Sequence, residues 1–175
     1  NLVTDGLPAL ALALEPGDSN VMQREPFQPT ESIFARGLGG YIIRIGLVFA
    51  IVTISLMKWA FDRTHAVGYS GDPDTWKTIV FTTLCIAQMG HALAVRSVNQ
   101  LVIEINPFSN PLLLWAILGT ILLQLAVVYV APLRSFFGTH PLSLFELGVC
   151  FGCSLLIFIW IEGEKLFVRW FRSKS

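Results

Sequence analysis

Three oxygen-bearing side chains stand at helical spacing at the start of this chain. Asn1, Thr4 and Asp5 lie in an apolar stretch, and positions i, i+3 and i+4 share one face of an α-helix. An amide oxygen, a hydroxyl and a carboxylate are suitable ligands for Ca²⁺, Na⁺ or another hard cation. A carboxylate at membrane depth is costly and usually marks an ion or substrate pathway. The three residues are therefore predicted to form part of a cation site.

The same segment contains two residues that weaken a helix. Pro8 has no amide to donate to the carbonyl of Thr4, and Gly6 disfavours the turn between them. This predicts a helix that is opened at membrane depth, with free carbonyl groups lining a cavity. The alternative is that Asn1 and Thr4 only bridge helices by hydrogen bonds, while Asp5 pairs with a basic residue elsewhere.

A complete Ca²⁺ site needs about six to eight oxygen ligands, so this segment requires a second contributor. Gln88 is the best candidate, because it is strongly polar in the middle of a long apolar segment. An interhelical hydrogen bond would explain Gln88 equally well. His91, three residues further along the same face, could line a polar path or hydrogen-bond a neighbouring helix. Gln124 in the next apolar segment is interpreted as a hydrogen-bonding residue between helices.

The composition indicates that these residues lie in a membrane. Of the 175 residues, 54% are hydrophobic and 14% are charged, against about 25% charged residues in typical soluble domains. The formal net charge is zero, so there is no basic excess for a nucleic-acid partner. We predict an all-α membrane protein whose partners are the lipid bilayer and a transported cation.

Four apolar segments are each close to the roughly 20 residues that a helix needs to cross the hydrocarbon. They cover residues 41–61, 76–95, 112–130 and 144–161. The opening segment, residues 1–14, is too short to span, and we interpret it as the C-terminal half of a broken, ion-binding transmembrane helix. A re-entrant or interfacial segment is the alternative. The predicted organisation is this half-helix, a cytoplasmic loop over residues 15–40, and a four-helix support region with a short tail over residues 41–175.

Polar residues mark the predicted helix starts. Asp74 and Asn110 precede apolar segments, and Ser143 with Glu146 has the Ser-x-x-Glu form of a capping box. Glu146 is accordingly interpreted as a cap near the interface rather than as an ion ligand. The Cys-x-x-Cys pattern of Cys150 and Cys153 lies inside an apolar segment, so these cysteines are predicted to serve packing and not redox chemistry.

The basic residues predict the orientation of the chain. One set of loops carries Arg24, Arg36, Arg44, Arg96, Lys165, Arg169, Arg172 and Lys174, and the other carries Lys58, Arg63, Lys77 and Arg134. Positive charge is enriched in cytoplasmic loops. This places the loop 15–40 and the C-terminal tail in the cytoplasm.

Two stretches resemble a known family. The sequence Asn1-Leu-Val-Thr-Asp-Gly-Leu-Pro-Ala9, followed by Glu15-Pro-Gly-Asp18, resembles the sixth membrane helix and the following loop of P-type cation-transporting ATPases. The type II calcium pumps of the sarcoplasmic reticulum kind and their bacterial relatives are most similar. Gln88-Met-Gly-His-Ala-Leu93 resembles the eighth helix, and the likeness continues to the end of the chain.

The resemblance implies roles for individual residues. Asn1, Thr4 and Asp5 match cation ligands of the family, with Asp5 as the acid shared between two ions. Gln88 stands where the sarcoplasmic reticulum pump has a glutamate, which leaves the number and identity of the ions open. Ca²⁺ is the implied transported ion.

The resemblance also implies what lies outside this chain. The Asp-Lys-Thr-Gly phosphorylation motif of the family is not among the 175 residues. The domains that bind ATP and Mg²⁺ are expected to precede Asn1 in a longer pump, so this piece alone is expected to hydrolyse nothing. The implied location is the plasma (cell inner) membrane. A fragment of a channel or secondary transporter with a broken helix, or a non-transporting membrane anchor, remains the alternative.

Overall fold

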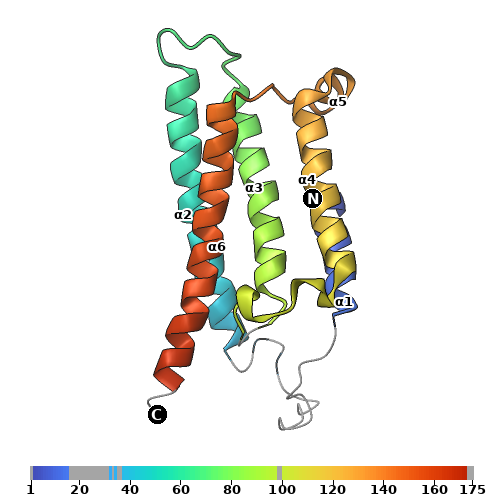
Figure 1. Cartoon of the computed structure of the whole chain (residues 1–175). Coiled ribbons are helices and arrows are strands. Elements are labelled where there is room, and N and C mark those ends of the chain that lie inside the picture. The colour runs from blue at the N-terminus through green and yellow to red at the C-terminus, as the bar shows by residue number, and fades with distance from the viewer. Residues whose placement is uncertain (1, 16–31, 33, 35–36, 98–99, 173–175) are drawn as a thin grey trace.

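The computed structural model describes residues 2–15, 32, 34, 37–97 and 100–172, with only the backbone described for residues 2–5, 107, 171 and 172. Every regular element in these ranges is a helix. They are α1 (Leu2–Ala13), α2 (Leu38–Thr64), α3 (Thr75–Ala94), α4 (Pro111–Tyr129), α5 (Ala131–Phe137) and α6 (Leu144–Arg172), with 3₁₀ turns η2 (Val102–Glu104) and η3 (Pro107–Ser109). The long helices stand side by side as a bundle (Figure 1). The predicted all-α fold class is therefore confirmed.

Three of the described helices, α2, α4 and α6, are long and apolar enough to cross a membrane. The fourth predicted span is present as the 20-residue helix α3, but it is not among these three. Its position in the bundle explains its more polar composition. Eleven of its residues are buried, several of them threonines, whereas the longer α2 buries only four. Helix α3 thus packs mainly against protein, while α2 exposes apolar side chains over most of its surface.

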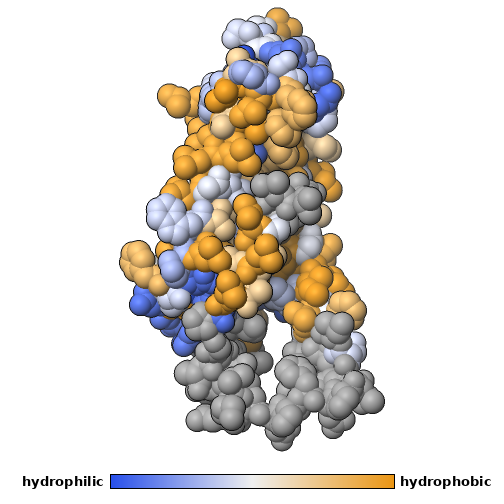
Figure 2. Space-filling view, turned by 90° about the vertical axis from the view of Figure 1, so that its right-hand side faces the viewer, coloured by the Kyte–Doolittle hydropathy of each residue, from blue (hydrophilic) through white to orange (hydrophobic). Residues whose placement is uncertain are grey.

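The core consists of three apolar clusters that all include residues of α3. The first joins α2, α3, α4 and α6, the second joins α1, α3 and α4, and the third joins α2, α3 and α6. On the face shown in Figure 2, apolar side chains dominate the middle of the bundle, and polar ones gather toward its two ends. This banded surface is typical of a protein surrounded by lipid.

The helix starts agree with the predicted positions, although one cap differs. Asn110 Oδ1 accepts a hydrogen bond from the amide of Leu113 at 3.0 Å. Ser143 and Glu146 form the reciprocal capping box, because the Ser143 amide donates to Glu146 Oε2 and the Glu146 amide donates to Ser143 Oγ. Asp74 is the N-cap of α3 but makes no side-chain cap. Its carboxylate instead pairs with Lys77 at 2.9 Å.

Helix α1 runs without interruption through Gly6 and Pro8. The predicted opening of this helix is therefore not confirmed in its described backbone. Pro8 lies inside the helix, so the carbonyl of Thr4 still lacks an amide four residues further on. The free carbonyl arises from one missing donor rather than from a break in the helix.

Candidate cation site and its anchor

The structure describes the predicted site residues to different extents. Asn1 lies outside the described residues, and Thr4 and Asp5 belong to the first turn of α1, where only the backbone is described. Gln88 is half-buried on α3. Across the described ranges, no group of three or more His, Cys, Asp or Glu side chains could hold a metal ion. The site must therefore be approached through the helices that carry its residues.

Helices α1 and α3 lie in contact and run in the same direction (Figure 1). Ala11 packs in one apolar cluster with Met89 and Ala92, and Glu15 pairs with Arg96. Glu15 and Arg96 are separated by 81 positions in the sequence. The same separation brings Gln88 level with position 7.

This register brings Gln88 close to the height of Asp5 in the bundle. Position 7 is two residues beyond Asp5, or about 3 Å along the helix axis. Helical side chains tilt toward the N-terminus of their own helix. Because α1 and α3 run in parallel, the side chains of both helices tilt the same way, and the offset between Asp5 and Gln88 stays at about 3 Å.

An ion pair fixes this register at the C-terminal end of α1. Arg96 donates from Nη2 and Nε to Glu15 Oε1, at 2.7 and 3.0 Å, and from Nη2 to Ser109 Oγ. The Arg96 side chain is 1% exposed and that of Glu15 is 17% exposed. A buried guanidinium with carboxylate and hydroxyl partners is strongly oriented, because losing the carboxylate would leave a buried charge unpaired.

Asn110 joins the same end of α1 to the start of α4. Its Nδ2 donates to the carbonyl of Ala11 at 2.8 Å and to Glu15 Oε2 at 2.7 Å. The first bond adds a second donor to a carbonyl in the last turn of α1, which also accepts the amide of Leu14 at 3.2 Å. We call Glu15, Arg96, Ser109 and Asn110 the anchor cluster.

The anchor cluster keeps Glu15 ionised. Burial alone would raise the pKa of Glu15, but hydrogen bonds from Arg96 and Asn110, together with the charge of Arg96, outweigh burial and lower it. The anchor cluster was not predicted from the sequence. The available signal was that Glu15 and Arg96 each follow an apolar segment directly, but nothing in the sequence pairs these two segment ends.

Comparison with known proteins identifies the family. The sequence model described as "Cation transporting ATPase, C-terminus" matches residues 1–167. The chain belongs to this family. It is 35% identical over 167 residues to a calcium-transporting ATPase of Bacillus subtilis, covering 95% of this chain and 18% of that protein. It is 34% identical over 169 residues to the mouse calcium-transporting ATPase type 2C member 2, covering 97% of this chain and 17% of that protein.

These matches confirm the resemblance to P-type cation-transporting ATPases. The chain spans less than a fifth of the length of these two relatives. Membership of this family excludes the alternatives of a channel or secondary-transporter fragment and of a non-transporting membrane anchor. Together with the three apolar helices, it makes the chain part of a multi-pass membrane protein.

Other polar residues of this cation-ATPase chain have the predicted structural roles. Gln124 Nε2 donates to Thr82 Oγ1 at 2.9 Å, which joins α4 to α3 inside the bundle. His91 Nε2 lies 3.4 Å from the hydroxyl of Tyr41 on α2. Among the cysteines, Cys150 is fully buried and its thiol donates to the carbonyl of Ile79 at 3.5 Å, as expected for a packing residue.

The described basic residues separate into two ends, as the sequence predicted. Arg44 pairs with Glu164, and Arg169 with Glu104, at the end of the bundle that holds the anchor cluster. Lys165 is buried there and donates to the carbonyl of Ala94 at 2.6 Å. Lys58 and Arg63 lie at the opposite end, in the last turns of α2 (Figure 1). The C-terminal ends of α1, α3 and α6 therefore share one side of the bundle.

Proposed function

We propose that this chain is the C-terminal membrane region of an ATP-driven calcium pump. The observation that carries the proposal is the match of residues 1–167 to the C-terminal region of cation-transporting ATPases. The two relatives named above are calcium-transporting ATPases. The chain would contribute part of the ion-binding site and the helices that support it.

In this proposal Asn1, Thr4, Asp5 and Gln88 are ligands of the transported ion. Their oxygen atoms suit Ca²⁺ better than a soft metal. The register of α1 against α3 supports the pairing of Asp5 with Gln88, and Pro8 leaves the carbonyl of Thr4 available. The remaining ligands, and the domains that bind ATP and Mg²⁺, would come from the part of the pump outside this chain.

The proposed organisation assigns a role to each part of the chain. Residues 1–14 form the C-terminal half of an ion-binding helix, residues 15–40 form a loop, and residues 41–175 form the support region. Helix α3 acts as a fourth crossing, because its 20 residues are about 30 Å long and it lies in contact with spanning helices on both sides. The end that holds the anchor cluster and the C-terminus faces the cytoplasm of a plasma-membrane pump.

The ion dependence of the full-length protein tests this function. ATPase activity is measured with Mg²⁺ and ATP while Ca²⁺, Mn²⁺ or Na⁺ is added singly after chelation of trace metals. The proposal predicts stimulation by Ca²⁺ at lower concentrations than by Na⁺. Activity that responds to Na⁺ alone, or to none of the three cations, would overturn the assignment.

A further inference from the structure

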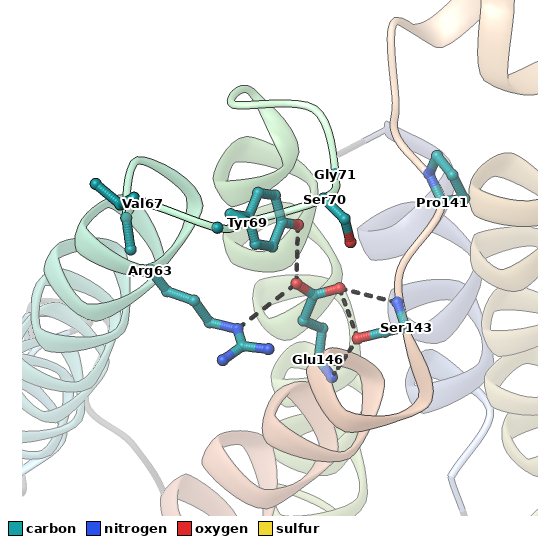
Figure 3. A pocket seen from close by; sticks show the side chains of 10 residues that line it. Arg63, Val67, Tyr69, Ser70, Gly71, Pro141, Ser143 and Glu146 are labelled. Carbon is teal, nitrogen blue, oxygen red and sulfur yellow. Dashed lines mark hydrogen bonds and ion pairs between the residues drawn. The ribbon is translucent and has the colours of Figure 1, made fainter.

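A cavity of about 450 Å³ opens at the end of the bundle opposite to the anchor cluster. It lies between the loop after α2 and the start of α6, and its walls include Arg63, Tyr69, Ser70, Ser143 and Glu146 (Figure 3). The cavity therefore contains one guanidinium, one carboxylate and several hydroxyl groups. It is separate from the proposed cation site.

The carboxylate of Glu146 is already satisfied by neutral donors. Its Oε1 accepts from the Tyr69 hydroxyl at 2.9 Å, and its Oε2 accepts from the amide and the hydroxyl of Ser143, each at 2.8 Å. Arg63 Nε lies 3.8 Å from Oε1, which is a charge contact but not a hydrogen bond. Glu146 thus supplies negative charge to the cavity without using the donors of Arg63.

The guanidinium of Arg63 is held in place while its donors stay available. Its central carbon lies 4.8 Å from the ring centre of Phe145 and 5.8 Å from that of Trp59. The side chain is 40% exposed, and no hydrogen-bond acceptor for it is found among the residues that the structure describes. A guanidinium fork supported by rings can bind a phosphate through two parallel hydrogen bonds.

The position of Arg63 relative to the membrane indicates which phosphate would reach it. Arg63 lies in the last turn of α2 and Phe145 in the first turn of α6, and both helices are candidate membrane spans. These turns lie where hydrocarbon gives way to lipid head groups. Leu144 and Phe145 beside the cavity are 87% and 58% exposed. A phospholipid would use both the guanidinium and this apolar surface, whereas free phosphate would use only the first.

We propose that Arg63 binds the phosphodiester of a phospholipid whose primary-amine head group enters the cavity. The positive charge of Arg63 and the negative charge of Glu146 together match a zwitterion. An ethanolamine ammonium can donate a hydrogen bond to the hydroxyl of Ser70, and the negative charge of Glu146 attracts it. A choline head group has no N–H to donate, and a glycerol head group has no positive charge.

Lipid binding to the purified full-length protein tests this site. Native mass spectrometry is recorded while the protein in detergent is titrated with phosphatidylethanolamine, phosphatidylcholine or phosphatidylglycerol of identical acyl chains. The wild type should bind phosphatidylethanolamine most tightly. Arg63→Gln should weaken that binding by about tenfold or more, because it removes a bidentate charged contact. Arg134→Gln, which removes a guanidinium from α5 at the same end of the bundle, should leave it unchanged.

Several results would overturn the proposal. These are wild-type binding by Arg63→Gln, equal losses in Arg63→Gln and Arg134→Gln, equal binding of all three lipids, or displacement of the lipid by an equal concentration of inorganic phosphate. If Arg63→Gln does not fold, Phe145→Leu carries the test, since it removes the supporting ring and keeps every charge. Phe145→Leu should also bind phosphatidylethanolamine more weakly, and unchanged binding would contradict the site.

Discussion

Replacing Arg96 by glutamine tests whether the anchor cluster holds the proposed ion-binding helix in place. The change removes the two hydrogen bonds to Glu15 and the one to Ser109. Breaking a buried ion pair by removing one partner costs about 3–5 kcal/mol. Glu15 keeps 17% exposure and its bond from Asn110, so water and Asn110 offset part of the loss. We therefore expect a destabilisation of about 3 kcal/mol, at the lower end of that range.

This loss should appear as weaker calcium activation. If about half of the 3 kcal/mol is lost from the ion-bound arrangement of α1 and not from the ion-free one, the Ca²⁺ concentration for half-maximal ATPase activity rises about tenfold. The assay uses the full-length pump in lipid vesicles, with thermal unfolding measured on the same samples. Arg169→Gln is the matched control, because its pair with Glu104 is solvent-exposed at the same end and contributes only about 0–1 kcal/mol.

The double variant Glu15→Gln/Arg96→Gln separates the ion pair from other effects of the substitution. Removing both charges leaves no unpaired buried ion, so the double variant should be more stable than Arg96→Gln alone. If Arg96→Gln changes neither the unfolding temperature nor the calcium dependence, the anchor cluster does not position α1 and this reasoning is refuted.

Three further predictions concern other polar groups. The pKa of Glu15 is lowered from its ordinary value of 4.5, so its contribution to stability is complete above about pH 4.5 and disappears as the pH falls through the lowered value. Lowering the pH through this range should therefore reduce the free energy of unfolding of the wild type more than that of Glu15→Gln. Gln88→Ala should weaken calcium activation and Gln88→Glu should retain it, measured as calcium-dependent ATPase activity; equal behaviour of Gln88→Ala and wild type would make Gln88 a packing residue. Gln124→Ala leaves the buried hydroxyl of Thr82 without its partner and should cost about 1–3 kcal/mol in unfolding measurements, with little change in calcium affinity.

Local features of the fold could be predicted because their causes are local. Length and apolar character identified α2, α4 and α6, and the Ser-x-x-Glu spacing predicted the capping box of Ser143 and Glu146. Asp74 was predicted correctly as a boundary and wrongly as a cap. Its neighbour Lys77 competes for the carboxylate, and a pattern of cap residues contains no information about that competition.

Features that depend on packing were missed. The short helix α5 follows Val130 directly and has no side-chain cap, and although Pro132 in its first turn is a start signal, the segment was interpreted as a loop. The anchor cluster joins residues separated by 81 and 95 positions. Hydrophobic periodicity shows which face of a helix is buried, but it does not give the register of one helix against another. The chemical types of Asn1, Thr4, Asp5 and Gln88 were readable from the sequence, whereas the offset that brings position 88 within about two residues of the level of position 5 required the structure.

The most direct test of the proposed function is Asp5→Asn in the full-length protein. The variant keeps the size of the side chain and removes the charge that the transported cation would require. We predict that calcium-dependent ATPase activity disappears while membrane insertion and thermal stability are retained. Asp62→Asn is the matched control, since it removes an exposed carboxylate paired with Lys58 at the opposite end of the bundle. An Asp5→Asn protein whose calcium dependence equals that of the wild type would contradict the assignment of this helix to the ion pathway.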